Sequence, residues 1–172
     1  IRGSQQQQQQ QQQQAQKPQK PEPSVHPLSI TLEEMYNGAT KRLKITRHRN
    51  GQNTPNVHTL EVVIKPGWKE GTKITYENDG DQDKKTGLYS DIVFLIKEKP
   101  HNLYKRVNND LTIDFPISLT QALTGVKHTF TLLDKSTVDI DTYGTVITPD
   151  NATKTIWGRG FANKNGPGNF VV

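Results

Sequence analysis

The stretch SITLEEMYNGATKRLKI, residues 29–45, decides the fold, because its first half returns later in the chain as ISLTQALTG, residues 117–125. Matching positions lie 87 residues apart: Ile30 with Ile117, Leu32 with Leu119, Met35 with Ala122, and Gly38 with Gly125. A second correspondence pairs PGWKEGTKITYENDG (66–80) with PDNATKTIWGRG (149–160) at an offset of 83. Self-similarity of this kind indicates two tandem copies of one structural module.

Each copy predicts one short helix with defined ends. A hydroxyl residue is followed three positions later by Glu or Gln, the capping-box pattern, at Thr31–Glu34 and Ser118–Gln121. Gly38 and Gly125 then stand where a helix ends in a left-handed residue, a conformation that glycine adopts without steric cost. The spacing predicts one or two helical turns, docked by Leu32 and Met35 in the first copy and by Leu119 and Leu123 in the second.

The rest of the repeat predicts strands. Alternating or β-branched runs are separated by turn signals such as RNGQN, KPG, NDGD and KTG. In the first copy the runs are KRLKI (41–45), HTLEVVI (58–64), TKITYE (72–77) and SDIVFLIK (90–97). In the second they are DLTIDFPI, KHTFTLL, STVDI and KTIW. The fold class is therefore mostly β, with HNLYKRVNND (101–110) as the junction between the copies.

Composition restricts the function. The 172-residue chain has no cysteine, so it has neither disulfides nor thiolate metal sites, which fits a reducing compartment. Its five histidines have no metal-ligand spacing, and no catalytic triad or carboxylate pair can be assembled, so we expect no metal, no cofactor and no enzymatic activity. The chain contains no 18-residue apolar stretch that would predict a membrane span, and its amino end does not resemble a secretory signal.

The two ends of the chain differ in character. Residues 5–14 are all glutamine and KPQKPEPS (17–24) is proline-rich and charged, so residues 1–24 are predicted to form a disordered tail or linker. The chain begins with Ile1 and ends in the apolar run NFVV, which we interpret as the edges of a fragment.

The net charge of +5 raises nucleic-acid binding as an alternative function. Strand-borne basic residues motivate it, namely Lys41, Arg42, Lys44, Arg47 and Arg49. Residues 25–172 carry 19 basic and 16 acidic residues, a mild excess, and few aromatic residues flank the basic strand for base stacking. We therefore expect no nucleic-acid partner. Another alternative is that the two modules only space other domains.

Several long motifs resemble a known family. GATKRLKITR, VIKPGWKEGTKITYENDGD, FLIKEKPHNLYKRVNNDL, FPISLTQALTG and GRGFANKNGPGNFVV are similar to the carboxy-terminal substrate-binding region of DnaJ-type J-domain co-chaperones. The zinc-containing class inserts four CxxCxGxG elements where this chain has only RHRNGQNTPNV (47–57). The resemblance is therefore to the zinc-free class, called class B or type II.

The resemblance implies two tandem β-sandwich-like domains, each with one short helix. The expected limits are 25–99 for domain I, which binds peptide, and 100–172 for domain II, truncated before a dimerisation helix. The family also implies a cytoplasmic location, with a nuclear one left open. Full-length members are homodimers that carry a J domain, so this chain alone is expected to be a monomer that does not stimulate the partner chaperone's ATPase.

The resemblance also implies a binding site. Its expected ligands are unfolded or hydrophobic polypeptide and the acidic Glu-Glu-Val-Asp tail of the seventy-kilodalton heat-shock chaperone. The positions that match the family's client groove in domain I are Leu28, Lys41, Leu43, Ile45 and Phe94, with His26 beside them. Family members often have an aromatic residue where this chain has Leu43, which predicts a preference for aliphatic clients. His26 stands where members usually have an apolar residue.

Overall fold

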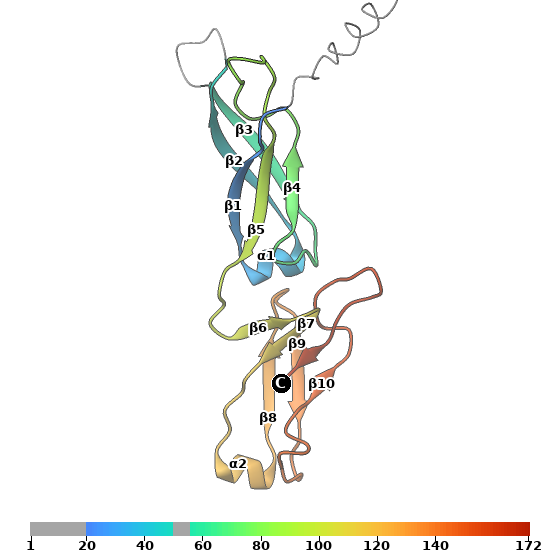
Figure 1. The fold of residues 1–172 in the computed structure, drawn as a ribbon. Helices are drawn as coiled ribbons and strands as arrows, with labels where there is room; N and C mark the ends of the chain where they lie inside the picture. Colours follow the sequence, from blue (N-terminus) through green and yellow to red (C-terminus); the bar gives the residue numbers. More distant parts are fainter. Residues whose placement is uncertain (1–19, 50–55) are drawn as a thin grey trace, which may run out of the picture.

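The structure is a computed structural model that describes residues 20–49 and 56–172. In the first module, the described residues 24–49 and 56–98 form five strands and one helix (Figure 1). In chain order they are β1 (Ser24–Ile30), α1 (Leu32–Asn37), β2 (Ala39–Arg47), β3 (Asn56–Ile64), β4 (Lys73–Tyr76) and β5 (Ile92–Glu98). The four predicted strand runs of this copy all form strands, which confirms that part of the sequence reading.

The first module consists of two sheets with a shared apolar core. Strands β1 and β5 pair in parallel, β4 pairs antiparallel with β5, and β2 and β3 form a separate antiparallel hairpin. Both sheets contribute fully buried side chains, among them Ile30, Val62 and Ile96. The hairpin alternates half-buried and exposed residues, as expected when one face of a sheet covers a core. The mostly β, sandwich-like prediction is confirmed.

Helix α1 forms as its capping box predicts. The Thr31 N–H donates to Glu34 Oε2 at 2.9 Å, and the Glu34 N–H donates to Thr31 Oγ1 at 3.4 Å. Gly38 ends the helix with the expected positive φ of 80°, but its ψ of 157° is extended rather than left-handed helical. This backbone region is essentially open to glycine alone. It turns the chain directly from the helix into strand β2.

The second module, residues 104–171, repeats this order with shorter strands and with one additional strand at its start. They are β6 (Tyr104–Val107), β7 (Asp110–Ile113), α2 (Leu119–Thr124), β8 (Lys127–Thr131), β9 (Thr137–Asp141), β10 (Thr155–Ile156) and β11 (Phe170–Val171). One sheet has the order β10-β11-β7-β6 and the other is the β8-β9 hairpin. Strand β6 pairs with β7, so the expected junction 101–110 contributes a strand to this sheet.

Helix α2 has the predicted capping box, with the Ser118 N–H donating to Gln121 Oε1 at 2.8 Å, but it is not docked as predicted. Leu119 is 76% exposed and Leu123 is 57% exposed, and no residue of this helix is buried. The expectation that these two leucines anchor it is wrong. The reason is position: α1 lies between the two modules, whereas α2 lies at the far end of the molecule (Figure 1).

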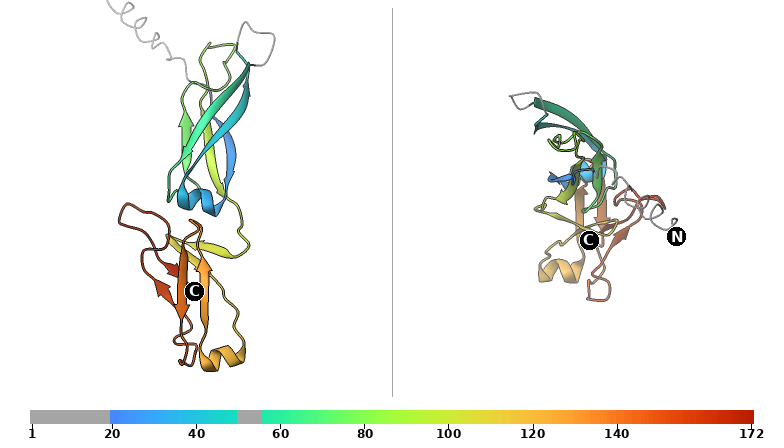
Figure 2. Two further views of the ribbon diagram at one scale, coloured as in Figure 1. Left: turned by 180° about the vertical axis from the view of Figure 1, so that it is seen from behind. Right: turned by 45° about the horizontal axis from the view of Figure 1, so that its top comes forward.

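The two modules meet at α1 (Figure 2), and their contacts there are polar and aromatic. Arg106 of β6 donates to the Trp68 carbonyl at 2.5 Å and to the Gly67 carbonyl at 3.0 Å. Its guanidinium lies 4.1 Å from the centroid of the buried Phe161 ring. From α1, the Asn37 side chain donates to the Leu133 carbonyl at 2.9 Å. These contacts join the modules end to end.

Some predictions stay open. The disorder of residues 1–24 falls mainly on residues 1–19, which lie outside the described residues, as does the glutamine run. Ser24 is already part of β1. The expected domain limits of 25–99 and 100–172 remain a prediction.

Candidate functional site

The predicted site residues of strand β2 lie on one face of the first module's hairpin. Lys41, Leu43 and Ile45 are half-buried, while the side chains between them, Arg42 and Lys44, are exposed. The two aliphatic side chains pack against the core from its edge. This alternation follows from the strand period of two, so the sequence pattern alone assigned these faces correctly.

Leu28 and Phe94 lie deeper than the sequence reading expected. Leu28 is 7% exposed and Phe94 is 3% exposed, and both belong to the core. His26 is exposed and pairs with Phe94 in the parallel β1–β5 register, with ring centroids 6.1 Å apart. A small pocket of about 280 Å³ opens between His26 and Ile45 and brings these two predicted residues together. We call the six predicted residues the first-module site: His26, Leu28, Lys41, Leu43, Ile45 and Phe94. Their role in binding stays a prediction.

Lys41 is already engaged within the module. Its Nζ lies 2.8 Å from Glu34 Oε2 of α1 and donates to the Ser29 carbonyl at 3.2 Å. Partial burial acts to raise the pKa of Glu34, but hydrogen bonds from Lys41 and the Thr31 N–H, with the Lys41 charge, outweigh it and lower this pKa. An acidic ligand at Lys41 would therefore compete with Glu34.

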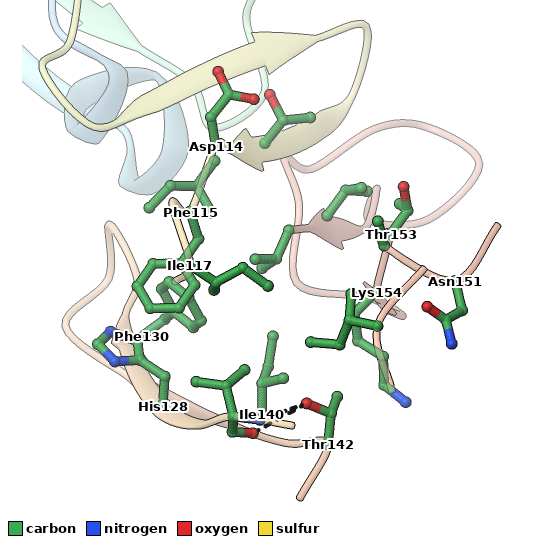
Figure 3. Close-up of a pocket in the computed structure, with 17 residues that line it drawn as sticks. Asp114, Phe115, Ile117, His128, Phe130, Ile140, Thr142, Asn151, Thr153 and Lys154 are labelled. Atoms are coloured by element: carbon green, nitrogen blue, oxygen red, sulfur yellow. Dashed lines mark hydrogen bonds between the residues drawn. The ribbon is translucent and has the colours of Figure 1, made fainter. Parts of the chain in front are cut away.

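A larger apolar pocket lies in the second module, where the sequence reading placed no site (Figure 3). It has a volume of about 470 Å³ and lies between the β8-β9 hairpin and the β7-β11 side of the other sheet. Three rings form one wall: the His128 ring centroid is 4.5 Å from that of Phe115 and 4.5 Å from that of Phe130. Ile113 and Val172 also line it. We call it the aromatic pocket.

The aromatic pocket occupies the repeat positions of the predicted site. Four of its lining residues follow site residues by the 87-residue offset: Ile113 after His26, Phe115 after Leu28, His128 after Lys41, and Phe130 after Leu43. The repeat itself was thus the signal that could have found them. Sequence reasoning missed them because it took the site from the family resemblance, which places the client groove in the first domain.

The basic strand patch behind the nucleic-acid alternative is partly paired with acidic side chains. Besides the Lys41–Glu34 pair, Arg47 Nη1 lies 2.7 Å from Asp79 Oδ1, and Arg42 Nε lies 3.9 Å from Glu61 Oε2. The Arg42 pair is exposed and weak, whereas the Arg47 side chain is only 11% exposed. Two of the five basic residues are thus firmly paired, and the expectation of no nucleic-acid partner stays a prediction.

No group of His, Cys, Asp and Glu side chains within residues 20–49 and 56–172 could hold a metal ion. In the same range no helix is long and apolar enough to cross a membrane.

The fold and the pockets together define a class of protein: two tandem β modules, of which the second has an apolar pocket beside its hairpin and the first a smaller, mostly polar one. Sequence comparison gives the family. The DnaJ C terminal domain family matches residues 24–172, and the chain belongs to this family. It is the carboxy-terminal region of a class B, or type II, member.

Curated relatives agree with this assignment. DnaJ protein homolog 1 of Drosophila melanogaster is 40% identical over 80% of this chain and 41% of its own length. Protein SIS1 of Saccharomyces cerevisiae is 33% identical over 84% of this chain and 41% of its own. DnaJ homolog subfamily B member 5 of Homo sapiens is 46% identical over 60% of this chain and 30% of its own. The chain thus spans less than half the length of these relatives. Membership in this family supports a general chaperone role.

Proposed function

We propose that the chain binds extended apolar segments of unfolded polypeptides, in the first-module site and in the aromatic pocket. The observation that carries this proposal is the apolar pocket of the second module, which is lined by residues at the repeat positions of four predicted site residues of the first module. The chemistry of the two sites differs, because the first module has Lys41 and Leu43 where the second has His128 and Phe130. We propose that the first prefers aliphatic client residues and the second aromatic ones.

Weak, reversible binding suits such a surface. Burying two or three client side chains contributes about 1.5–3 kcal/mol each, from which several kcal/mol of association and ordering cost must be subtracted. The result is a dissociation constant in the micromolar range or weaker, since micromolar corresponds to about 8 kcal/mol. A chaperone that hands its client onward needs such an affinity.

We further propose that the first-module site takes the acidic Glu-Glu-Val-Asp tail of the seventy-kilodalton heat-shock chaperone. Lys41 is the cation that would meet the tail, with Leu43 and Ile45 beside its valine. Because Glu34 holds Lys41 at 2.8 Å, the tail must displace that carboxylate. Replacing Glu34 with Gln should therefore tighten tail binding, and Lys41→Ala should weaken it.

The client proposal is tested by protection of an aggregating, chemically unfolded protein. Leu43→Asp places a charge on the inward face of β2 and should abolish most protection by the first module. Thr40→Asp introduces the same side chain on the exposed face of the same strand, away from the pocket between His26 and Ile45, and is the matched control. If both variants protect equally, the inward face is not a client site. Amide chemical shifts of the unaltered chain, titrated with an aliphatic peptide, give the same answer without a variant.

The tail proposal is tested by titrating a labelled Glu-Glu-Val-Asp peptide into the chain. Amide signals of residues 41–45 should shift, and more strongly at equal peptide concentration in the Glu34→Gln variant. Unchanged signals at about millimolar peptide, which corresponds to only about 4 kcal/mol of binding, would refute docking at Lys41 while leaving the client proposal intact.

A further inference from the structure

A third pocket lies between the two modules and belongs to neither of the sites above. Its volume is about 540 Å³. The first module contributes the turn around Pro66 and Trp68, and the second contributes Asn109 and the loop residues 162–164. We call it the inter-module pocket. Trp68 is half-buried, packs against the core and supplies an aromatic surface on the first-module side.

The walls of the inter-module pocket are held rigidly. Arg106 donates to the carbonyls of both Gly67 and Trp68, and the Gly67 N–H donates to the Met35 carbonyl at 2.7 Å. The two modules touch here without a gap, because a Cβ added to Gly67 would lie 1.9 Å from the carbonyl oxygen of Ala162. The pocket is therefore preorganised and needs little ordering to accept a ligand.

Three lysines surround this apolar floor. Lys65 and Lys69 come from the first module and Lys164 from the second, and all three are exposed. Among the described residues, none of their ammonium groups lies within ion-pair distance of a carboxylate. The pocket thus combines an apolar surface with uncompensated positive charge.

We propose that the inter-module pocket binds an acidic peptide segment in which an apolar residue is flanked by Asp or Glu. The apolar residue packs on Trp68 and Pro66, and the flanking carboxylates reach the lysines of both modules. Such a ligand crosses the interface and stabilises the relative arrangement of the modules. The pocket offers one aromatic ring, whereas single-stranded nucleic acid is bound on successive rings, so the observations favour a peptide.

The inter-module pocket differs from the site at Lys41 in whether its lysines are already paired. At the first-module site the lysine is occupied by Glu34, while the lysines of the inter-module pocket are not paired. The inference stands apart from the client and tail proposals, because it uses none of the residues of the first-module site or the aromatic pocket.

The test uses the fluorescence of Trp68 as a reporter inside the pocket. The chain has two tryptophans, and Trp157 is 80% exposed, so Trp157→Phe leaves Trp68 as the single emitter. The probe is the capped peptide acetyl-Glu-Glu-Leu-Glu-Glu-amide, which has no terminal carboxylate. We expect a saturable change in Trp68 emission that weakens as ionic strength rises. Replacing Lys65, Lys69 and Lys164 together with Ala should weaken the affinity roughly tenfold.

The matched control replaces Lys84, Lys85 and Lys97, three exposed lysines that do not line the pocket, with Ala. Equal weakening in both triple variants would show a general charge effect and overturn the proposal. An unchanged Trp68 signal at about millimolar peptide would also overturn it. Loss of peptide binding in Leu43→Asp but not in the lysine triple variant would assign the peptide to the first-module site instead. Displacement of the peptide by a thymidine oligonucleotide at lower concentration would make the pocket a nucleic-acid site.

Discussion

The two short helices of this protein have the same local design and different surroundings. Both begin with a capping box and end at a glycine with a φ of 80°. Leu32 of α1 is 1% exposed, whereas Leu119, its equivalent 87 residues later, is 76% exposed. Helix α1 is covered by the second module, and α2 has no such neighbour in the described chain (Figure 1). The comparison teaches that local sequence forms the helix and that its place in the molecule decides what it buries.

The candidate sites of the two modules also differ. At equivalent positions the first module has the ion pair of Lys41 with Glu34, whereas the second has His128 with the uncharged Gln121. The His128 ring instead contacts two phenylalanine rings, tilted against Phe115 and edge-on to Phe130. One scaffold thus supports a charged, aliphatic site and an aromatic one.

The largest expected effect is a difference in unfolding free energy between equivalent substitutions in the two helices. Leu32→Ala should cost about 2–5 kcal/mol of unfolding free energy, because it opens a cavity in the core beneath α1. Leu119→Ala, the same change at the repeat position, should cost less than about 0.5 kcal/mol because the side chain is exposed. Urea denaturation of both variants measures the difference. Similar losses would mean that α2 is covered in solution.

The second prediction tests the two helix-ending glycines. A Cβ at Gly125 would lie 1.9 Å from the Thr142 carbonyl oxygen, whereas at Gly38 the nearest atoms are 3.0 Å away. Both substitutions also force alanine into a positive φ, at about 1–3 kcal/mol. Gly125→Ala should therefore destabilise by about 3 kcal/mol or more and Gly38→Ala by less, as thermal unfolding would show. The reverse order would contradict the close approach at Thr142.

The third prediction breaks the contact that joins the modules. Arg106→Met keeps much of the apolar stem but removes the hydrogen bonds to Gly67 and Trp68, which should cost about 2 kcal/mol. Amide exchange should rise in α1 and around Phe161 and stay unchanged at the distant helix α2. Lys105→Met, at the exposed neighbouring position of β6, is the control. Uniformly faster exchange would indicate global rather than interfacial loosening.

The smallest effect is a pH dependence confined to the first module. The pKa of Glu34 is lowered in the folded state, so its contribution to stability is complete above its ordinary value of 4.5 and is lost as the pH falls through the lowered value. Glu34→Gln should remove less than about 1 kcal/mol of the stability difference between about pH 7 and about pH 3. Equal pH profiles for Glu34→Gln and the unaltered chain would contradict the lowered pKa.

Much of the fold was predictable because its signals are local. The alternation of Lys41, Leu43 and Ile45 with exposed neighbours assigned the faces of β2, and the capping boxes located both helices. The expected anchoring by Leu119 and Leu123 was wrong, because an amphipathic spacing does not reveal whether a partner surface exists. The depth of Phe94 was equally hidden, since a continuous apolar run does not say which residue meets the core.

The candidate sites depended more on tertiary contacts. Sequence placed the first-module residues on a common face, but only the structure showed that Glu34 already pairs with Lys41. The aromatic pocket combines Phe115 from the segment after β7, His128 and Phe130 from β8, and Val172 at the end of the chain. In the sequence these residues have the pattern of ordinary core residues, and only the packing of the two sheets brings them together.

The sequence by itself determined the repeated β module, its two capped helices and its family, because hydrogen-bonding caps, glycine conformations and strand alternation act over a few residues. Only the tertiary structure decided which helix is buried, which lysines are free and where the pockets open. Burial and ion pairing depend on residues far apart in the chain, such as Arg106 with Gly67 and Trp68. Their distances are set by how the sheets and modules pack, and no local pattern encodes them.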